Sequence, residues 1–173
     1  MSFNILPLLP PLLSLTVGLF LTISAMAQAP HRRTNQLFGL LCIWWIMLEP
    51  AFVAHSLLQD EGQILAVERF IHGAYVFLPV ITLLFSHHVL GITRPALTWA
   101  TLVISLLLAL TVPTRWYFTG LNYFEWGSIA QGGPAFQAFG LYSIVAIIYL
   151  WSSFCAEFCV NPNPKRGCSA FIF

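Results

Sequence analysis

Long apolar blocks separated by short polar segments dominate the pattern of this chain. Five blocks stand out, at residues 5–26, 36–58, 68–91, 96–112 and 135–160. At a rise of 1.5 Å per residue, about 20 apolar residues cross the hydrocarbon core of a bilayer. Within each block, apolar side chains would cover every face of a helix instead of one stripe. In a small protein this pattern indicates contact with lipid. The pattern therefore predicts an all-α fold, a polytopic transmembrane bundle of five membrane-spanning helices.

Composition supports the membrane class and excludes one class of partner. The chain has 173 residues, of which 58% are hydrophobic and 8% are charged, whereas a soluble domain carries about 25% charged residues. Seven Lys and Arg stand against six Asp and Glu, so the chain lacks the excess of basic residues that nucleic-acid binding requires. We expect a multi-pass protein of the inner (plasma) membrane whose first partner is the lipid bilayer.

Basic residues define an orientation. Five of the seven lie in alternate loops: Arg32, Arg33, Arg94, Lys165 and Arg166. The segment 59–67, expected to be a loop, holds two acidic residues and no basic one. The positive-inside rule then places the N-terminus outside. We therefore expect two parts of the chain: a transmembrane helical, sensor-like domain at residues 1–160 and a short cytoplasmic tail at residues 161–173.

Glu49 is the acidic residue that the pattern places deepest in a span. A charged side chain at the centre of a bilayer costs about 2.5–3.5 kcal/mol on insertion scales. Two interpretations are open: a ligand contact or polar switch inside the bundle, or a neutral structural side chain. In either case we expect Glu49 to face the bundle interior and to bond a neighbouring helix through Thr16, Tyr75, Thr82 or Ser105. Pro50 beside it favours a bend.

Two histidines form a second candidate site. His55 and His72 lie toward the predicted outer ends of consecutive spans, and Glu68 lies four residues before His72, on the same helix face. Such a pair is able to bind haem or a metal, or it bonds backbone and water at the interface. We expect no cofactor and no metal, since the four cysteines form no CxxC motif and no Cys/His ligand spacing.

The connection 114–133 is rich in aromatic residues. One interpretation is an aromatic belt or a helix lying on the outer leaflet. The other is a lid over an outward pocket for a small apolar or amphipathic ligand. The ligand-binding candidates in this segment are Trp116, Tyr123, Glu125 and Trp126.

Motifs of known enzymes are missing from the sequence. It contains no GxSxG, HExxH, Walker or Gly-rich dinucleotide motif. We therefore expect a protein without catalytic residues.

Three segments carry a family resemblance. Residues 32–52 have a basic start and an aromatic-rich run, residues 68–92 contain Leu-Pro and a Phe-rich end, and residues 124–150 contain an aromatic, Gly-Pro-aromatic start. Together they resemble the N-terminal seven-helix membrane sensor module of bacterial histidine kinases and diguanylate cyclases. That family continues with two more spans and a signalling domain, so the resemblance implies a truncated module of about five helices.

The resemblance implies an integral membrane sensory module, a signal input without its own catalytic domain. It would sense a small ligand, whose identity is unknown, or a membrane state. Its output would need a homodimer or a partner signalling protein. The alternatives are a haem- or quinone-linked redox membrane subunit using the two histidines, or a small transporter subunit, which the absence of an internal repeat weakens.

Overall fold

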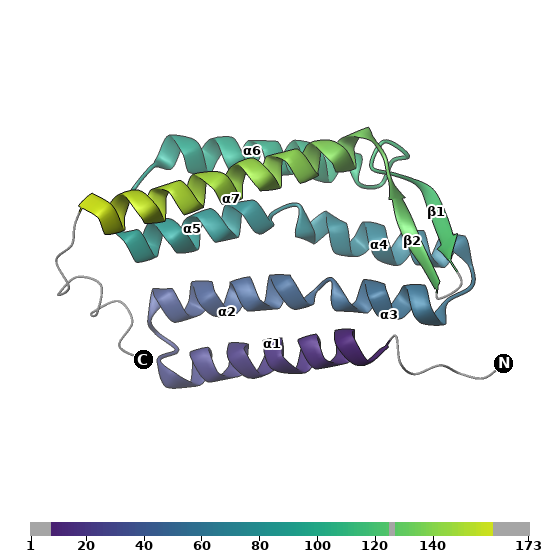
Figure 1. Cartoon of the computed structure of the whole chain (residues 1–173), viewed down its shortest axis with the longest axis horizontal. Coiled ribbons are helices and arrows are strands. Elements are labelled where there is room, and N and C mark those ends of the chain that lie inside the picture. Colours follow the sequence, from purple (N-terminus) through teal and green to yellow (C-terminus); the bar gives the residue numbers. More distant parts are fainter. Residues whose placement is uncertain (1–7, 125–126, 161–173) are drawn as a thin grey trace.

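The computed structural model describes residues 8–124 and 127–160 of the chain. Seven helices and one two-stranded hairpin follow one another in these residues (Figure 1). The elements are α1 (Leu9–Gln28), α2 (Arg33–Ile46), α3 (Glu49–Leu57), α4 (Glu61–Tyr75), α5 (Leu78–Leu90), α6 (Pro95–Thr111), β1 (Phe118–Phe124), β2 (Gly127–Gly132) and α7 (Pro134–Val160).

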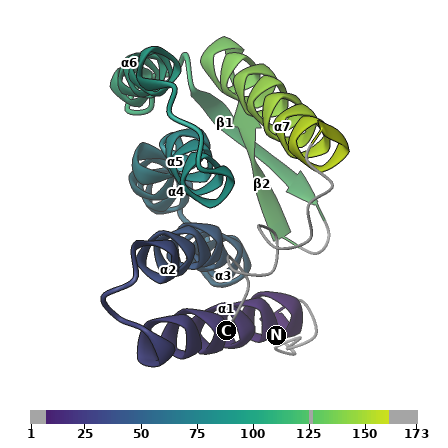
Figure 2. The same cartoon turned by 90° about the vertical axis from the view of Figure 1, so that its left-hand side faces the viewer.

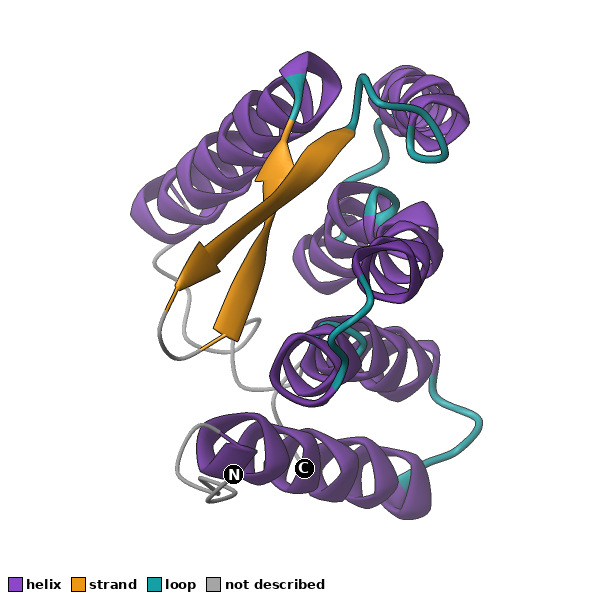
Figure 3. Ribbon diagram, turned by 90° about the vertical axis from the view of Figure 1, so that its right-hand side faces the viewer, coloured by secondary structure: helices purple, strands orange, loops and turns teal. Residues whose placement is uncertain are grey.

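The helices form a single row with one helix beside it. Seen along the helices in Figure 2, α6, the α4–α5 pair, the α2–α3 pair and α1 are stacked in order, and α7 lies to one side, in contact with α5 and α6. The hairpin crosses one end of the row, as Figure 3 shows from the opposite side. Helix α7 exposes Leu141, Ile148 and Trp151 on its surface. An apolar surface of this size suits lipid.

Helix lengths support the predicted class of protein. In the described residues, four helical stretches are long and apolar enough to cross a membrane: Leu9–Gln28, Arg33–Leu57, Glu61–Leu90 and Pro134–Ala156. A shorter apolar helix, Pro95–Thr111, corresponds to the fourth predicted span. The loops that carry Arg32, Arg33 and Arg94 lie at one end of the bundle and the hairpin lies at the other (Figure 1). Which end faces the cytoplasm stays a prediction.

Proline breaks the second and third spans into collinear pairs. Helix α2 ends at Ile46 and α3 begins just before Pro50, while α4 ends at Tyr75 and α5 begins just before Pro79. Proline lacks a backbone N–H and leaves a carbonyl of the preceding turn without its helical donor. Such a helix is tolerated in a membrane when side chains from neighbouring helices supply donors.

Two side chains supply donors at the break between α4 and α5. The Trp44 indole nitrogen donates to the Ala74 carbonyl at 2.9 Å, and the Ser105 hydroxyl donates to the Val76 carbonyl at 2.8 Å. Ser105 also lies 3.3 Å from the Tyr142 hydroxyl. The third span is thus held at its break by α2, α6 and α7.

The third span begins earlier than predicted. Residues 61–67 are helical, so the expectation of a loop over 59–67 is wrong for most of that segment. The Asp60 carboxylate accepts the Gln63 backbone N–H at 2.8 Å, which is the geometry of a helix N-cap. As a result Glu68 lies two turns inside α4 instead of at the start of a span.

The aromatic connection forms an antiparallel hairpin, so the prediction of a helix on the outer leaflet is wrong. Strands β1 and β2 pair from Phe118 opposite Gly132 to Phe124 opposite Gly127. The pairing satisfies the backbone N–H and C=O groups that the two strands direct toward each other. The base of the hairpin is tight: a Cβ added to Gly133 would lie 2.4 Å from the Trp116 carbonyl oxygen. This hairpin is the exception to the all-α fold in the described residues.

Candidate functional site

A cavity of about 620 Å³ lies beneath the hairpin. It is bounded by α1, α3, α4, β2 and the first turns of α7. Most of its wall is apolar, with contributions from Pro11, Phe52, Tyr75, Phe118, Phe136 and Phe139. Its polar side chains come mainly from Glu49, His55, Glu68, His72 and Ser128, and no Lys or Arg of the described residues lines it. The cavity suits a molecule with an apolar body and one polar end.

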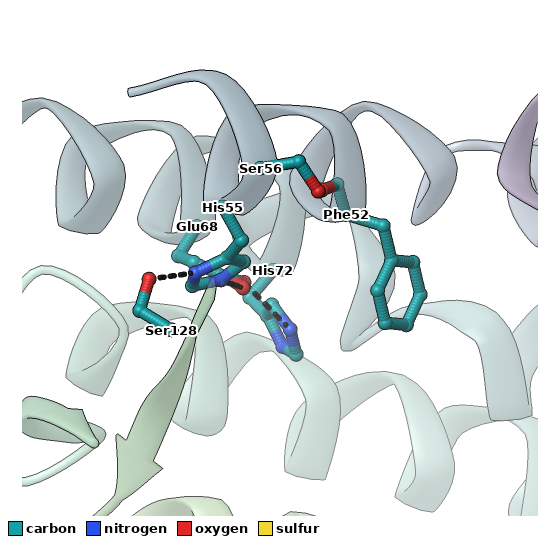
Figure 4. Close-up of polar contacts among 6 residues, drawn as sticks. All are labelled: Phe52, His55, Ser56, Glu68, His72 and Ser128. Carbon is teal, nitrogen blue, oxygen red and sulfur yellow. Dashed lines mark hydrogen bonds and ion pairs between the residues drawn. The ribbon is translucent and has the colours of Figure 1, made fainter. Parts of the chain in front are cut away.

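Glu68 joins the two predicted histidines into one cluster (Figure 4). Its Oε1 lies 2.5 Å from His55 Nε2, and its Oε2 lies 3.3 Å from His72 Nε2. The side chains of His55 and Glu68 are 8% and 9% exposed. His55 lies in the last turn of α3, whereas Glu68 and His72 are one turn apart on α4. The cluster therefore links the two broken spans at the hairpin end of the bundle.

The second nitrogen of each imidazole bonds the hairpin or its base. His55 Nδ1 lies 2.9 Å from Ser128 Oγ on β2, and His72 Nδ1 lies 3.2 Å from the Tyr117 hydroxyl. Two neutral imidazoles and an ionised Glu68 fit these contacts. His55 Nε2–H then donates to Glu68 Oε1, His72 Nε2–H lies near Oε2, and each Nδ1 accepts a hydrogen bond from a hydroxyl. The cluster thereby fastens the hairpin over the cavity.

Tyr117 is fully buried beside this cluster. Burial, reinforced by the nearby Glu68 carboxylate, raises the pKa of the Tyr117 phenol above its ordinary value. The phenol therefore stays protonated at neutral pH and can donate to His72. Aromatic rings surround it: Phe118, Phe136 and Phe139 all lie within 6.4 Å of its ring centroid.

One carboxylate oxygen remains without a hydrogen bond. Glu68 Oε2 is buried and has no hydrogen-bond partner among the described residues. His72 Nε2 lies 3.3 Å from this oxygen without forming a hydrogen bond to it. Leaving a buried acceptor unpaired is costly. Since Glu68 lines the cavity, this oxygen is available to a donor on a bound molecule.

Glu49 also lines the cavity, from the first residue of α3, and is half-buried. Its predicted position on the bundle interior agrees with this placement. The predicted hydrogen bond to another helix is absent among the described residues. Three of the four proposed partners bond backbone carbonyls instead: Thr16 bonds Leu12, Thr82 bonds Leu78 and Ser105 bonds Val76. Glu49 is thus a second acidic group facing the cavity.

Two aromatic candidates of the connection, Trp116 and Tyr123, lie away from the cavity. Trp116 is 70% exposed and Tyr123 is 63% exposed, and neither lines the cavity. Glu125 and Trp126 lie outside the described residues. The hairpin reaches the cavity through Phe118 and through the β2 residues 127–130.

Both ring nitrogens of His55 and of His72 lie against other side chains of the protein. A haem iron would have to displace one of these contacts on each ring. Within the described part of the chain, no three His, Cys, Asp or Glu side chains are placed to hold a metal ion. The expectation that the histidines bind no haem stays a prediction.

Sequence reasoning identified both histidines but missed the residues that connect them. The i, i+4 spacing of Glu68 and His72 indicated that Glu68 orients one ring. Nothing in the sequence indicated that the same carboxylate also reaches His55, or that Ser128 and Tyr117 complete the cluster. Comparison of the chain with protein-family models, with curated proteins and with solved structures gives no match.

Proposed function

We propose that this chain is a membrane-embedded sensory module that binds a small amphipathic ligand in the cavity beneath the hairpin. The single observation that carries the proposal is the apolar cavity of about 620 Å³ with a buried carboxylate cluster at its wall. In this proposal the module lies in the inner membrane with the hairpin on the outer side. It acts as a signal input without catalytic residues of its own.

The chemistry of the polar wall favours a ligand with a cationic, hydrogen-bond-donating head, such as an amine. Within the described part of the chain, Glu68 Oε2 has no hydrogen-bond donor and no Lys or Arg lines the cavity to attract an anion, while Glu49 adds a second carboxylate. A charge-assisted hydrogen bond to a buried carboxylate is worth about 1.5–3 kcal/mol. The apolar remainder of the ligand would contact the aromatic wall.

Ligand binding at Glu68 would change the contacts that hold the hairpin. An ammonium group that bonds the carboxylate competes with the imidazoles of His55 and His72. These rings in turn hold Ser128 and Tyr117. Because α3 and α4 continue beyond their breaks as α2 and α5, a shift at the cluster would reach the opposite end of the bundle. There a second copy or a partner signalling protein would receive it.

The proposal is tested with three probes of one skeleton: 4-phenylbutylamine, 4-phenylbutanol and 4-phenylbutanoate. Binding to the purified full chain in lipid nanodiscs is measured by isothermal titration calorimetry, with empty nanodiscs as the blank. The amine is expected to bind most tightly. Glu68→Gln, which removes the charge but retains the shape, should weaken it by about 10- to 100-fold, the range that 1.5–3 kcal/mol implies.

Glu61→Gln is the matched control, since Glu61 is exposed on the same helix and does not line the cavity. It should leave the affinity unchanged. Amine binding no stronger than that of empty nanodiscs, or an equal loss in both variants, would refute the proposal.

A further inference from the structure

The end of the bundle opposite the hairpin carries a second pocket, of about 590 Å³. It lies between the start of α2, the end of α5 and the start of α6. Its basic and aromatic side chains are Arg33, His87, His88, Arg94 and Trp99, and none of the described carboxylates lines it. We infer that this pocket binds the phosphate headgroup of an anionic phospholipid.

Among the described residues, no acidic side chain compensates the positive charge of the pocket. Arg33 and Arg94 are exposed, and neither forms an ion pair with any described residue. They approach the pocket from different elements: Arg33 from the first residue of α2, and Arg94 from the loop before α6. A phosphate placed between them would neutralise the repulsion of two like charges. Basic pockets between membrane helices on the cytoplasmic side bind anionic headgroups for this reason.

The N-termini of α2 and α6 add to the positive potential of the pocket. Helix α2 begins at Arg33 and α6 at Pro95, and neither N-cap side chain bonds the first turn. Neither first turn contains an acidic residue. Unpaired backbone N–H groups and the positive end of the helix dipole both favour an anion. Gly91, in the left-handed conformation at φ 66°, ends α5 and turns the chain toward α6.

The apolar part of the pocket favours a lipid over a free anion. Leu37 and Leu84 line it beside the basic groups, and the Trp99 ring is 66% exposed. Trp is enriched at the level of lipid headgroups, where its ring meets both apolar and polar surroundings. A free phosphate would use the basic side chains alone, whereas a phospholipid would also cover the leucines with an acyl chain.

The inference is tested by native mass spectrometry of the full chain in detergent. Phosphatidylglycerol, phosphatidylcholine with the same acyl chains, and inorganic phosphate are titrated separately. Phosphatidylglycerol should bind at least tenfold more tightly than either of the others. Arg33→Gln and Arg94→Gln should each weaken it about fivefold, and the double variant about 25-fold, in line with about 1 kcal/mol per basic residue at an anionic surface.

Arg115→Gln is the matched control, because Arg115 is exposed near the hairpin at the other end of the bundle. It should leave the affinity unchanged, and Arg94→Lys, which keeps the charge, should retain most of it. Equal binding of the two lipids, or an equal loss in Arg115→Gln, would overturn the inference. Inorganic phosphate that binds as tightly as phosphatidylglycerol would overturn the assignment to lipid. None of these outcomes depends on ligand binding under the hairpin.

Discussion

Replacing Ser105 by alanine tests whether side-chain donors hold the broken third span. Ser105 lies on α6 and is completely buried. Its hydroxyl donates to the Val76 carbonyl at 2.8 Å and lies 3.3 Å from the Tyr142 hydroxyl on α7. Alanine removes both contacts and leaves the Val76 carbonyl without this donor. The Tyr142 hydroxyl keeps its bond to the Thr101 carbonyl at 3.1 Å.

The expected loss of stability follows from these contacts. Hydrogen bonds between membrane helices contribute about 0.6 kcal/mol on average and about 1.7 kcal/mol at most in double-mutant cycles. The short bond to Val76 is expected near the upper value, since its carbonyl has lost a helical donor at the break. The longer contact to Tyr142 adds a fraction of the average. We expect Ser105→Ala to lower the free energy of unfolding by about 1.5–2 kcal/mol.

Reversible unfolding in mixed micelles of dodecylmaltoside and dodecylsulfate, followed by circular dichroism, measures this change. Ser152→Ala is the control, since the Ser152 hydroxyl is exposed and bonds a carbonyl of its own helix at 2.8 Å. The control should change the free energy of unfolding by less than about 0.5 kcal/mol, as for most surface substitutions. If the two variants lose the same stability, the Ser105 bonds do not support the break, and the reasoning is refuted.

Three further predictions concern the hairpin end. Folding raises the pKa of the Tyr117 phenol, so the stability that this phenol contributes should be complete below the ordinary tyrosine pKa of about 10 and should be lost as the pH rises through its folded pKa. The free energy of unfolding should therefore fall less steeply with alkaline pH in Tyr117→Phe. An unchanged pH dependence in this variant would contradict the prediction. Asp60→Cys should react with impermeant maleimide only from outside the cell, and labelling only from the cytoplasm would reverse the orientation. The purified protein should show no Soret band, whereas a band lost in His72→Ala would favour the redox alternative.

Gly133 offers a test of the tight base of the hairpin. A Cβ at this position would meet the Trp116 carbonyl oxygen at 2.4 Å, and a backbone atom cannot move aside as a side chain can. Gly133→Ala should therefore lower the free energy of unfolding by about 1–3 kcal/mol, the usual cost of overpacking. Gly140→Ala is the control, since an added Cβ there meets nothing within 4 Å. Equal stability of the two variants would contradict the packing at the hairpin base.

Local properties of the sequence were sufficient to predict the class of a helical membrane protein and the approximate positions of most of its helices. Apolar blocks longer than a bilayer is thick predict membrane helices wherever they occur, because the backbone must satisfy its own hydrogen bonds in lipid. Pro50 favoured a bend next to Glu49, and α2 and α3 are separated there. The start of α4 was missed although Asp60 is a good N-cap residue, because two acidic residues with no basic one suggested a loop.

Tertiary structure alone decided the site. Glu68 meets His55 from 13 residues away, and His55 meets Ser128 from 73 residues away. Such contacts depend on how α3, α4 and β2 pack, and no local pattern encodes the distance between side chains on different elements. The hairpin also depends on tertiary contacts. Its strands pair next to the point where Tyr117 and Phe118 pack against Val76, Val112 and Phe139. A short aromatic segment has no periodicity that distinguishes this arrangement from a surface helix, so only the packing partners select it.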